Sequence, residues 1–464
     1  MSRTSRALAP ARNITLLIAL ALILFYATIH WGGVLREDRS MYLLALGLVA
    51  VVAALWRSGI QDAPRLDPVF RWLLPLLPAY AVLQIVPLPT NLVAVLSPAR
   101  GQVLALLAPL GISSPFASLS VYPSGTLQQL LVISGQILVF LLVRELMWFF
   151  AERRWLLAVP IVVTALWQAV LGMSQYWSAN HSAVSGNYAN RNHFAGLLEL
   201  ALPFAVAYPI AMFRQTDYRE GISATAAIKA STSCAIAAAL LVGIMFSLSR
   251  MGFVSALLSL VVMGVLVALS SPLVRRLAVP AAKGVAVVAV LGGVLITFLF
   301  LPPDQLVARF GRISADAPEG RAQLWGESFK LFRAYPIVGC GLGGYESAFP
   351  KYKSSGPLVS DDHAHNDYLQ YLSETGVAGG MIFFALIVTT VRAPFRVAVS
   401  KADPSTWALA LACAGSLSAI LLHSTADFNL YIPANAMIVS WVAGIGAALV
   451  RPDVRQVTDN NLRA

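Results

Sequence analysis

The chain has 464 residues, of which 58% are hydrophobic and 12% are charged, and its mean hydropathy is +0.72. This composition is far too apolar for a soluble protein and predicts a polytopic membrane protein. The formal net charge is +11, but most basic residues flank apolar segments, where they set orientation in the bilayer, so nucleic-acid binding is excluded.

Apolar segments of membrane-spanning length recur along the chain. The first follows three arginines and superficially resembles a secretory signal, but no small-residue cleavage site follows it, so we expect a retained helix. Since a span needs roughly 20 apolar residues, we predict twelve spans. They lie near residues 13–30, 41–56, 70–87, 127–146, 155–174, 194–213, 227–247, 252–270, 279–301, 374–392, 406–423 and 432–450. The segment 93–111 is interrupted at Ser97-Pro98 and predicts an interfacial helix instead.

The basic residues predict an orientation, because short cytoplasmic loops carry an excess of Lys and Arg. With the N-terminus inside, 21 of the 33 basic residues fall into seven cytoplasmic groups, and the short outer loops hold five. We therefore predict an all-α protein with both termini cytoplasmic. Its parts are spans one to nine in 1–301, one large periplasmic loop at 302–373, spans ten to twelve in 374–450, and a cytoplasmic tail at 451–464. All six histidines then lie at the outer side, where nucleotide-activated substrates are absent.

Two short outer segments each carry an arginine among polar residues. One, Asn190–His193, precedes the sixth span, and the other, Ser247–Gly252, joins spans seven and eight. A lone arginine at a helix end often reaches lipid phosphate, and that alternative stays open. A guanidinium also binds phosphate bidentately, and helix N-termini favour anions. Arg191 and Arg250 could therefore clamp a pyrophosphate without a metal ion. Glu199 lies deeper in the sixth span, which follows Arg191, and the sequence shows no partner for its charge.

The long outer loop contains a predicted helix and a glycine-rich turn. Between Arg321 and Arg333 apolar residues recur at near-helical spacing, and Pro336 ends the pattern, so Arg321 is a third cation at a helix start. The glycines of the segment 339–344 lack a surrounding βαβ unit. They predict a tight turn, with a phosphate cradle as the lesser alternative.

Residues 360–374 predict a helix that begins at the polar cluster Ser360–Asp362. His363 and His365 are two residues apart and would not face the same way on a helix. We favour one histidine as a general base, oriented by Asp361. The alternative is a pair of solvated loop histidines.

A dense polar segment, His423–Asn429, follows span eleven. Polar residues at a membrane mouth usually line a cavity or a substrate path, so we expect Asp427 to support the site. A zinc or iron site at the two loop histidines would also need ligands such as His423 or Asp427. We do not favour such a metal site.

At these residues the chain resembles the bacterial O-antigen ligase and O-antigen polymerase superfamily. The pieces that carry the resemblance are Asn190-Arg191-Asn192-His193, Ser249-Arg250-Met251-Gly252, Gly320-Arg321 with Trp325, Pro336 before the glycine turn, and His363-Ala364-His365-Asn366 with Tyr368-Leu369. The resemblance covers most of the chain. It implies an inverting, metal-independent glycosyltransferase of the bacterial inner membrane, without a cofactor and with a periplasmic active site. Such enzymes transfer a glycan from undecaprenyl pyrophosphate to an acceptor hydroxyl.

The resemblance also implies roles for individual residues. His365, directly before Asn366, would be the catalytic base, and Arg191 and Arg250 would hold the donor pyrophosphate. Arg321 joins them as a donor-binding candidate, although the family pattern leaves open whether it touches donor or acceptor. The expected supporting residues are Asn192, His193, His363, Asn366, Asp361 and Asp427.

Several activities share these pieces. The acceptor is lipid A core in an O-antigen ligase, which we favour, and a second lipid-linked repeat unit in an O-antigen or exopolysaccharide polymerase. In a protein O-oligosaccharyltransferase the acceptor is another protein. Twelve spans alone would equally suit a transporter or flippase. However, the sequence shows no obvious internal repeat and few ionisable residues within spans, whereas transporters often show both.

Overall fold

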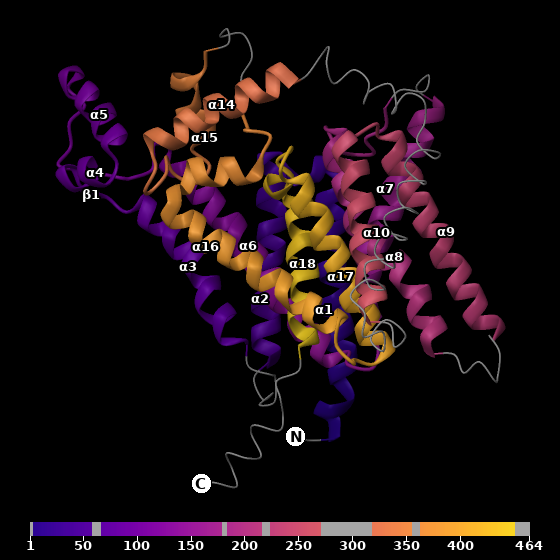
Figure 1. Ribbon diagram of the computed structural model, residues 1–464. Coiled ribbons are helices and arrows are strands. Elements are labelled where there is room, and N and C mark those ends of the chain that lie inside the picture. Colours follow the sequence, from indigo (N-terminus) through magenta and orange to yellow (C-terminus); the bar gives the residue numbers. More distant parts are fainter. Residues whose placement is uncertain are drawn as a thin grey trace.

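The computed structural model describes residues 3–57, 66–178, 183–215, 223–270, 318–354 and 362–450. These residues are almost entirely helical, as Figure 1 shows. Two short strands, β1 (Leu88–Pro89) and β2 (Phe116–Ala117), pair antiparallel with Leu88 opposite Ala117. The predicted all-α fold class of a polytopic membrane protein is confirmed.

Ten helices in the described ranges contain segments that are long and apolar enough to cross a membrane. They are α1 (Arg3–Ile29), α2 (Arg36–Arg57), α3 (Pro68–Ile85), α6 (Pro123–Phe149), α7 (Val159–Ser178), α8 (Arg191–Gln215), α9 (Ala224–Phe246), α10 (Arg250–Ser270), α16 (Asp367–Ala398) and α17 (Pro404–His423). A shorter apolar helix, α18 (Pro433–Leu449), follows them. Eleven of the twelve predicted spans thus coincide with helices, and the one at 279–301 lies outside the described residues.

Short helices gather at one end of this bundle. They are α4 (Thr90–Leu96), α5 (Pro98–Leu107), α14 (Pro318–Ala334) and α15 (Tyr345–Ala348), with 3-10 turns at Trp31–Gly33, Ala108–Leu110, Phe349–Tyr352 and Asn429–Tyr431. A further 3-10 turn, Arg154–Leu157, lies at the other end, where Arg154 Nη1 donates to Thr406 Oγ1 near the start of α17. Figure 1 places α4, α5, α14 and α15 at the end opposite the start of α1. The break between α4 and α5 falls at Ser97, as predicted, so this segment does not span. The predicted helix after Arg321 is confirmed as α14.

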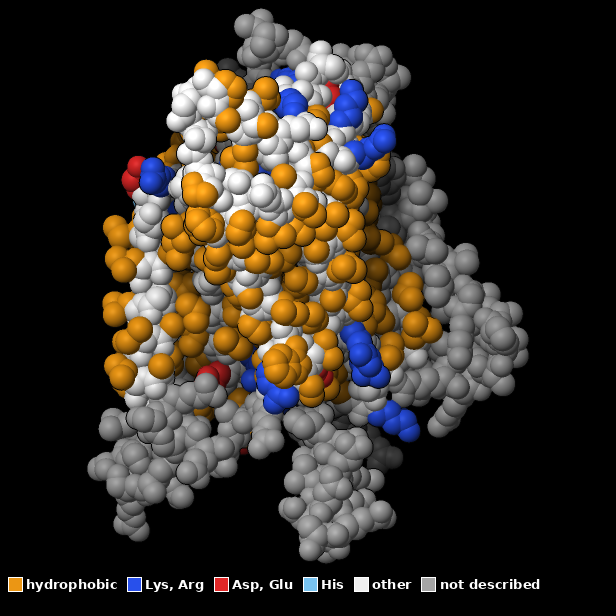
Figure 2. Space-filling view, turned by 90° about the vertical axis from the view of Figure 1, so that its left-hand side faces the viewer, with side chains coloured by type: hydrophobic (Ala, Val, Ile, Leu, Met, Phe, Trp, Pro, Cys, Tyr) orange, Lys and Arg blue, Asp and Glu red, His pale blue; other side chains and the backbone are white. Residues whose placement is uncertain are grey.

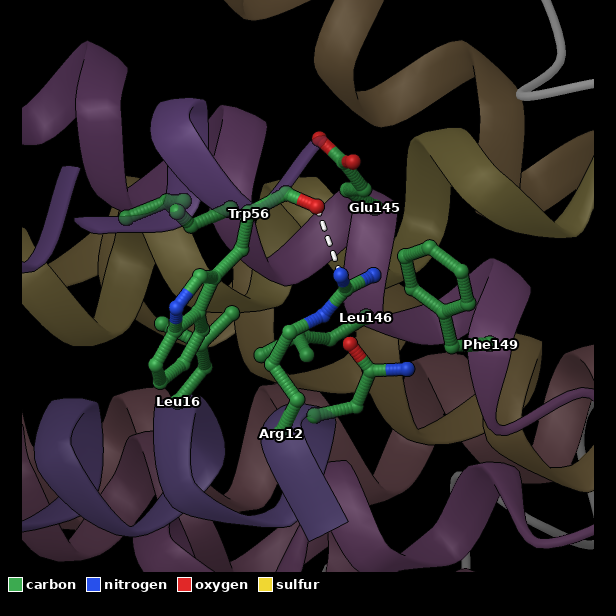
Figure 3. Close-up of a pocket in the computed structure, with 9 residues that line it drawn as sticks. Arg12, Leu16, Trp56, Glu145, Leu146 and Phe149 are labelled. Atoms are coloured by element: carbon green, nitrogen blue, oxygen red, sulfur yellow. Dashed lines mark hydrogen bonds between the residues drawn. The ribbon is translucent and has the colours of Figure 1, made fainter. Parts of the chain in front are cut away.

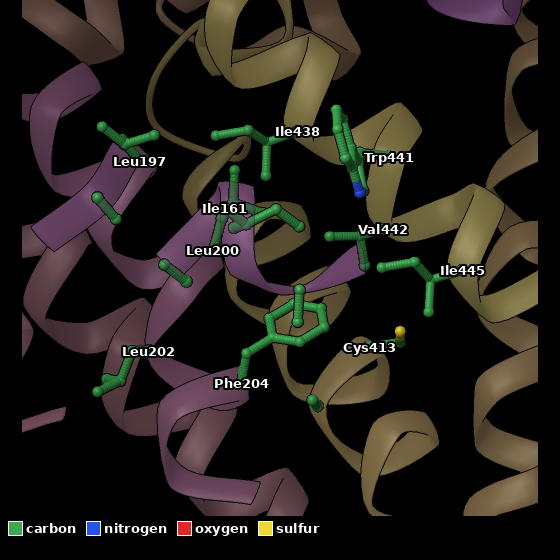
Figure 4. Packing of buried hydrophobic residues seen from close by; sticks show 14 of the residues in the cluster. Ile161, Leu197, Leu200, Leu202, Phe204, Cys413, Ile438, Trp441, Val442 and Ile445 are labelled. Atoms are coloured by element: carbon green, nitrogen blue, oxygen red, sulfur yellow. The ribbon is translucent and has the colours of Figure 1, made fainter. Parts of the chain in front are cut away.

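The centre of the bundle is formed by α8 and α17, whose apolar windows are 72% and 78% buried, compared with 11% for α2. Lipid tails are as apolar as these side chains, so close packing rather than escape from water holds such helices together. Leu200 and Phe204 of α8 lie near Cys413 of α17 and Trp441 of α18 (Figure 4). A hydrogen bond from Ser416 Oγ to Leu200 O (2.9 Å) joins the two central helices.

The outer surface matches a position in a bilayer. On the face shown in Figure 2, hydrophobic side chains cover the middle of the molecule, and Lys and Arg side chains lie towards both ends. A protein that spans a membrane needs such an apolar belt bordered by charged residues.

One helix start differs from the prediction. Helix α16 begins at Asp367, with Asn366 as its N-cap, because the Asn366 side chain accepts a hydrogen bond from Leu369 N (3.0 Å). Asp362 to Asn366 are not helical, so a helix starting at the acidic cluster is wrong there. The physical reason is tertiary. The backbone N–H of Asp367 donates to the carbonyls of Ser424 and Asp427, which ties this segment to the connection between α17 and α18. Ser360 and Asp361 lie outside the described residues.

The glycine-rich segment 339–344 is a tight turn docked on a kink of α16. At the kink, Gly376 has φ 61° and ψ −170°, a conformation essentially restricted to glycine, and an added Cβ would overlap the carbonyl of Ile337. Each backbone N–H group of this segment donates a hydrogen bond within the protein. Three acceptors belong to Ser373 and Glu374 of α16: Ser373 O accepts from Cys340, Glu374 O from Gly341, and Glu374 Oε2 from Gly343. The others are Tyr335 O for Gly339, Gln84 Oε1 for Leu342 and Gly341 O for Gly344. These donors are all used within the protein, so the tight turn is confirmed and the phosphate cradle is not.

Candidate active site

Three histidines meet around the ring of Phe428, in the connection between α17 and α18. His363 stacks on this ring with centroids 4.0 Å apart, and His193 and His365 approach it edge-on at 4.5 and 4.8 Å. His193 comes from the first turn of α8, and the other two precede α16. Segments far apart in the sequence therefore build one histidine cluster, which we define as His193, His363 and His365.

His365 is paired with a buried carboxylate. Its Nδ1 lies 3.3 Å from Asp427 Oδ1; the Asp427 side chain is fully buried, whereas that of His365 is 33% exposed. A carboxylate only accepts hydrogen bonds, so it favours the tautomer with hydrogen on Nδ1 and leaves the Nε2 lone pair free to take a proton. The predicted carboxylate partner of a histidine base is present, but it is Asp427, whereas Asp361 lies outside the described residues.

Asp427 is held in its charged form by its neighbours. Its Oδ1 also lies 3.5 Å from His193 Nε2 and accepts a hydrogen bond from Phe428 N (2.9 Å). Burial alone would raise the pKa of Asp427, but hydrogen bonds from His193 and His365 outweigh it and hold this pKa well below its ordinary value. The carboxylate is therefore a fixed negative charge beneath His365.

His363 has a different environment from His365. Its ring is packed between Phe428 and Tyr431, and its Nδ1 contacts Gln370 Nε2 at 2.9 Å. This burial lowers the pKa of His363 to about 4, so the imidazole is neutral at neutral pH. Of the two loop histidines, His365 is the one that combines a carboxylate partner with access from outside.

The predicted arginines begin helices that border the cluster. Arg191 is the first residue of α8, two positions before His193, and Arg250 is the first residue of α10. The two helix starts touch, since a Cβ added at Gly252 would lie 2.5 Å from that of Ala195. Both arginines are partly exposed. Two arginines thus lie at adjacent helix N-termini, and helix N-termini favour the binding of an anion.

Arg321 lies on a helix that approaches the histidine cluster from another direction. It lies on α14 one turn before Trp325. The indole N–H of Trp325 donates to the carbonyl oxygen of Ala364 (3.1 Å), and Ala364 is the residue between the two loop histidines. Positions four apart share a helix face, so Arg321 is on the Trp325 side of α14. Asn192 is partly exposed in the first turn of α8, and its backbone N–H donates to Asn190 Oδ1 (2.8 Å).

The sequence left Glu199 without a partner, and the structure supplies one. His423 Nδ1 lies 3.0 and 3.1 Å from the two carboxylate oxygens of Glu199, and both side chains are fully buried. The pair links the two central helices, α8 and α17. His423 is therefore occupied with Glu199. Within the described part of the chain no group of three or more His, Cys, Asp or Glu side chains is suited to hold a metal ion.

A separate pocket lies near the opposite end of the helices, between α1, α2 and α6. Arg12, Trp56, Glu145 and Phe149 line it (Figure 3), and Arg12 Nη1 donates to Trp56 O at 2.6 Å. Arg12 is near the start of α1, whereas the histidine cluster lies beyond the other ends of the spans. This pocket is therefore not part of the candidate site.

These observations define a class of protein: a multi-pass helical membrane protein in which a histidine–carboxylate pair lies beside helix N-termini that carry arginines. Residues 235–384 match the family model described as O-Antigen ligase (Wzy_C). The resemblance to the O-antigen ligase superfamily is thereby confirmed, and a membrane glycan-transfer function follows in general terms. The matched region includes Arg250, Arg321 and His365, whereas Arg191 and Asp427 lie outside it. No curated protein matches the chain.

Proposed function

We propose that this protein transfers a glycan from undecaprenyl pyrophosphate to an acceptor hydroxyl, in the manner of an O-antigen ligase. The observation that carries the proposal is the His365–Asp427 pair, 3.3 Å apart, beside the touching starts of α8 and α10. The first feature is suited to removing a proton, and the second to holding a pyrophosphate.

In this mechanism the acceptor hydroxyl gives its proton to Nε2 of His365 while its oxygen attacks the anomeric carbon. The bond from that carbon to the pyrophosphate oxygen breaks on the opposite face, so the configuration inverts. The departing pyrophosphate gains negative charge, which Arg191 and Arg250 stabilise with bidentate hydrogen bonds. Asp427 stabilises the imidazolium that forms at His365. Arg321, on α14, contributes a third positive charge to the donor.

The location proposed for this chemistry is the periplasmic face of the bacterial inner membrane. The histidine cluster is built at the start of α8 and just before α16, and α16 begins at the end of the bundle opposite the start of α1 (Figure 1). The distribution of Lys and Arg favours a cytoplasmic N-terminus. Both points support a site that faces the compartment where lipid-linked glycans and lipid A core meet.

The test uses the purified protein in nanodiscs with an undecaprenyl-pyrophosphate glycan, with and without lipid A core. A product that appears only with core supports a ligase, and products longer than the donor without core indicate a polymerase. We expect His365→Ala to abolish transfer and leave the protein folded. His30→Ala is the matched control, because His30 Nδ1 also lies 3.3 Å from a carboxylate, Asp38 Oδ1. Near-normal transfer by His365→Ala would exclude His365 as the base.

A further inference from the structure

Ala364, the residue before the proposed base, is held by hydrogen bonds at both of its backbone groups. The backbone N–H of Ala364 donates to Gln370 Oε1 (3.1 Å), and its carbonyl accepts from Trp325 Nε1 (3.1 Å). Ala364 itself is fully buried. Two long side chains from different helices, α14 and α16, therefore hold a single residue between His363 and His365.

His365 needs this support because of its backbone. Its φ is 46°, in the left-handed region that residues with a Cβ rarely adopt, and only Trp31 and Leu248 share a positive φ among the described residues other than glycine. If the backbone N–H and C=O of Ala364 were released, His365 would be expected to relax to an ordinary conformation. Its ring would then leave Asp427, and the pairing that prepares Nε2 would be lost.

The two holding side chains are themselves anchored. Gln370 Nε2 lies 3.4 Å from Glu374 Oε1, and the other oxygen of Glu374 accepts from Tyr431 OH (2.7 Å) and from the glycine turn. On α14, one turn beyond Trp325, Ser328 Oγ shares a 2.6 Å hydrogen bond with Tyr345 OH. The backbone of Ala364 is thus connected through Gln370 and Trp325 to the hydrogen-bond network of α14, α16 and the glycine turn.

We propose that Trp325 and Gln370 are positioning residues that hold His365 in its catalytic conformation. The inference rests on the proposed function for the meaning of that conformation. Because Arg321 lies one turn before Trp325 on α14, the same helix carries a cation for the donor and the contact that places the base.

Trp325→Phe tests the proposal, because it keeps an aromatic ring but loses the indole N–H donor together with part of the ring volume. We expect kcat to fall by roughly tenfold, the loss that one buried hydrogen bond can cause, while KM for the donor stays within about twofold. Trp407→Phe is the matched control: Trp407 Nε1 also donates to a backbone carbonyl, Ala398 O (2.8 Å), at the other end of the bundle. It should lower thermal stability at least as much and leave kcat per folded molecule unchanged.

A second measurement does not depend on glycan transfer. Diethyl pyrocarbonate modifies accessible neutral imidazoles, and mass spectrometry can score His363 and His365 separately. In the wild type we expect His365, whose side chain is 33% exposed and paired with Asp427, to react at a defined rate. In Trp325→Phe and in Gln370→Leu its ring leaves Asp427, and the modification rate of His365 should change several-fold. If wild-type protein transfers no glycan, the proposed function fails while this readout still tests the positioning. Unchanged kcat in an active Trp325→Phe protein, or unchanged modification in both variants, would overturn the inference.

Discussion

Replacing Asp427 by Asn tests the central pair most directly. The substitution preserves shape but removes the negative charge 3.3 Å from His365 Nδ1. Coulomb's law at an effective dielectric constant of about 20 gives roughly 5 kcal/mol between the carboxylate and the imidazolium formed during transfer. His365 is one-third exposed, so solvent screens part of this energy, and we take about half of it. A loss of about 2–3 kcal/mol corresponds to a kcat roughly one hundred times lower.

The assay for this variant is the initial rate of glycan transfer in nanodiscs at varied donor concentration. Because Asp427 does not contact the donor in the proposed mechanism, kcat should fall while the donor KM changes little. Asp38→Asn, in the other histidine–carboxylate pair with a 3.3 Å contact, should retain the wild-type rate. A kcat for Asp427→Asn within threefold of wild type would refute the argument that this charge stabilises the protonated base.

Three further predictions follow from the arginines, His363 and the kink in α16. Arg191→Lys and Arg250→Lys should each weaken donor use by about tenfold in kcat/KM, because lysine keeps the charge but loses the bidentate fork; equal kinetics for wild type and both variants would exclude a pyrophosphate clamp. The pKa of His363 is lowered to about 4 by burial, so between pH 6.5 and 4 the unfolded chain binds more protons than the native protein, and stability falls as the pH falls. His363→Gln should remove up to about 3 kcal/mol of this acid sensitivity, which thermal unfolding at a series of pH values will measure. Gly376→Ala should destabilise the protein by about 1–3 kcal/mol or more in the same thermal assay, because alanine cannot adopt the backbone conformation of Gly376 without strain. Gly326→Ala is the control: an added Cβ meets nothing within 4 Å there, so this variant should be neutral or slightly stabilising.

The helices could be predicted from sequence because the bilayer imposes their length. A spanning segment must satisfy its own backbone hydrogen bonds and remain apolar for about 20 residues, so hydropathy alone locates it. The same logic identified the break at Ser97-Pro98, where α4 ends and α5 begins. Local rules were sufficient wherever the deciding interaction was local or with lipid.

The start of α16 shows where local rules failed. Ser360 to Asp362 has the composition of a helix N-terminus, yet the helix begins at Asp367. Its first N–H group is used by carbonyls of the connection after α17, about 60 residues further along the chain, and no pattern near position 360 reveals this. Tertiary hydrogen bonding outweighed a plausible local cap.

The candidate site was predictable in its residue types but not in its pairing. Histidine, arginine and acidic residues at the outer ends of the spans could be recognised, and His365 and Asp427 were both among them. Their contact joins positions 62 residues apart, whereas spacing along the sequence favours the nearer Asp361 as the orienting carboxylate. The roles of Trp325 and Gln370 were hidden for the same reason, since each acts through a backbone group of Ala364 rather than through a recognisable side-chain motif.

Glu199 gives the clearest physical rule for going further from sequence. A carboxylate within a span is costly unless it meets a partner, so its presence in α8 required a cation or proton donor on a neighbouring helix. His423, at the end of α17, fills that requirement from 224 residues away. The pair fixes the depth of α17 against α8, which sets Asp427, four residues after His423, level with His193 on the first turn of α8. Those two side chains lie 3.5 Å apart, and in this register of the two helices the carboxylate also lies 3.3 Å from His365 Nδ1.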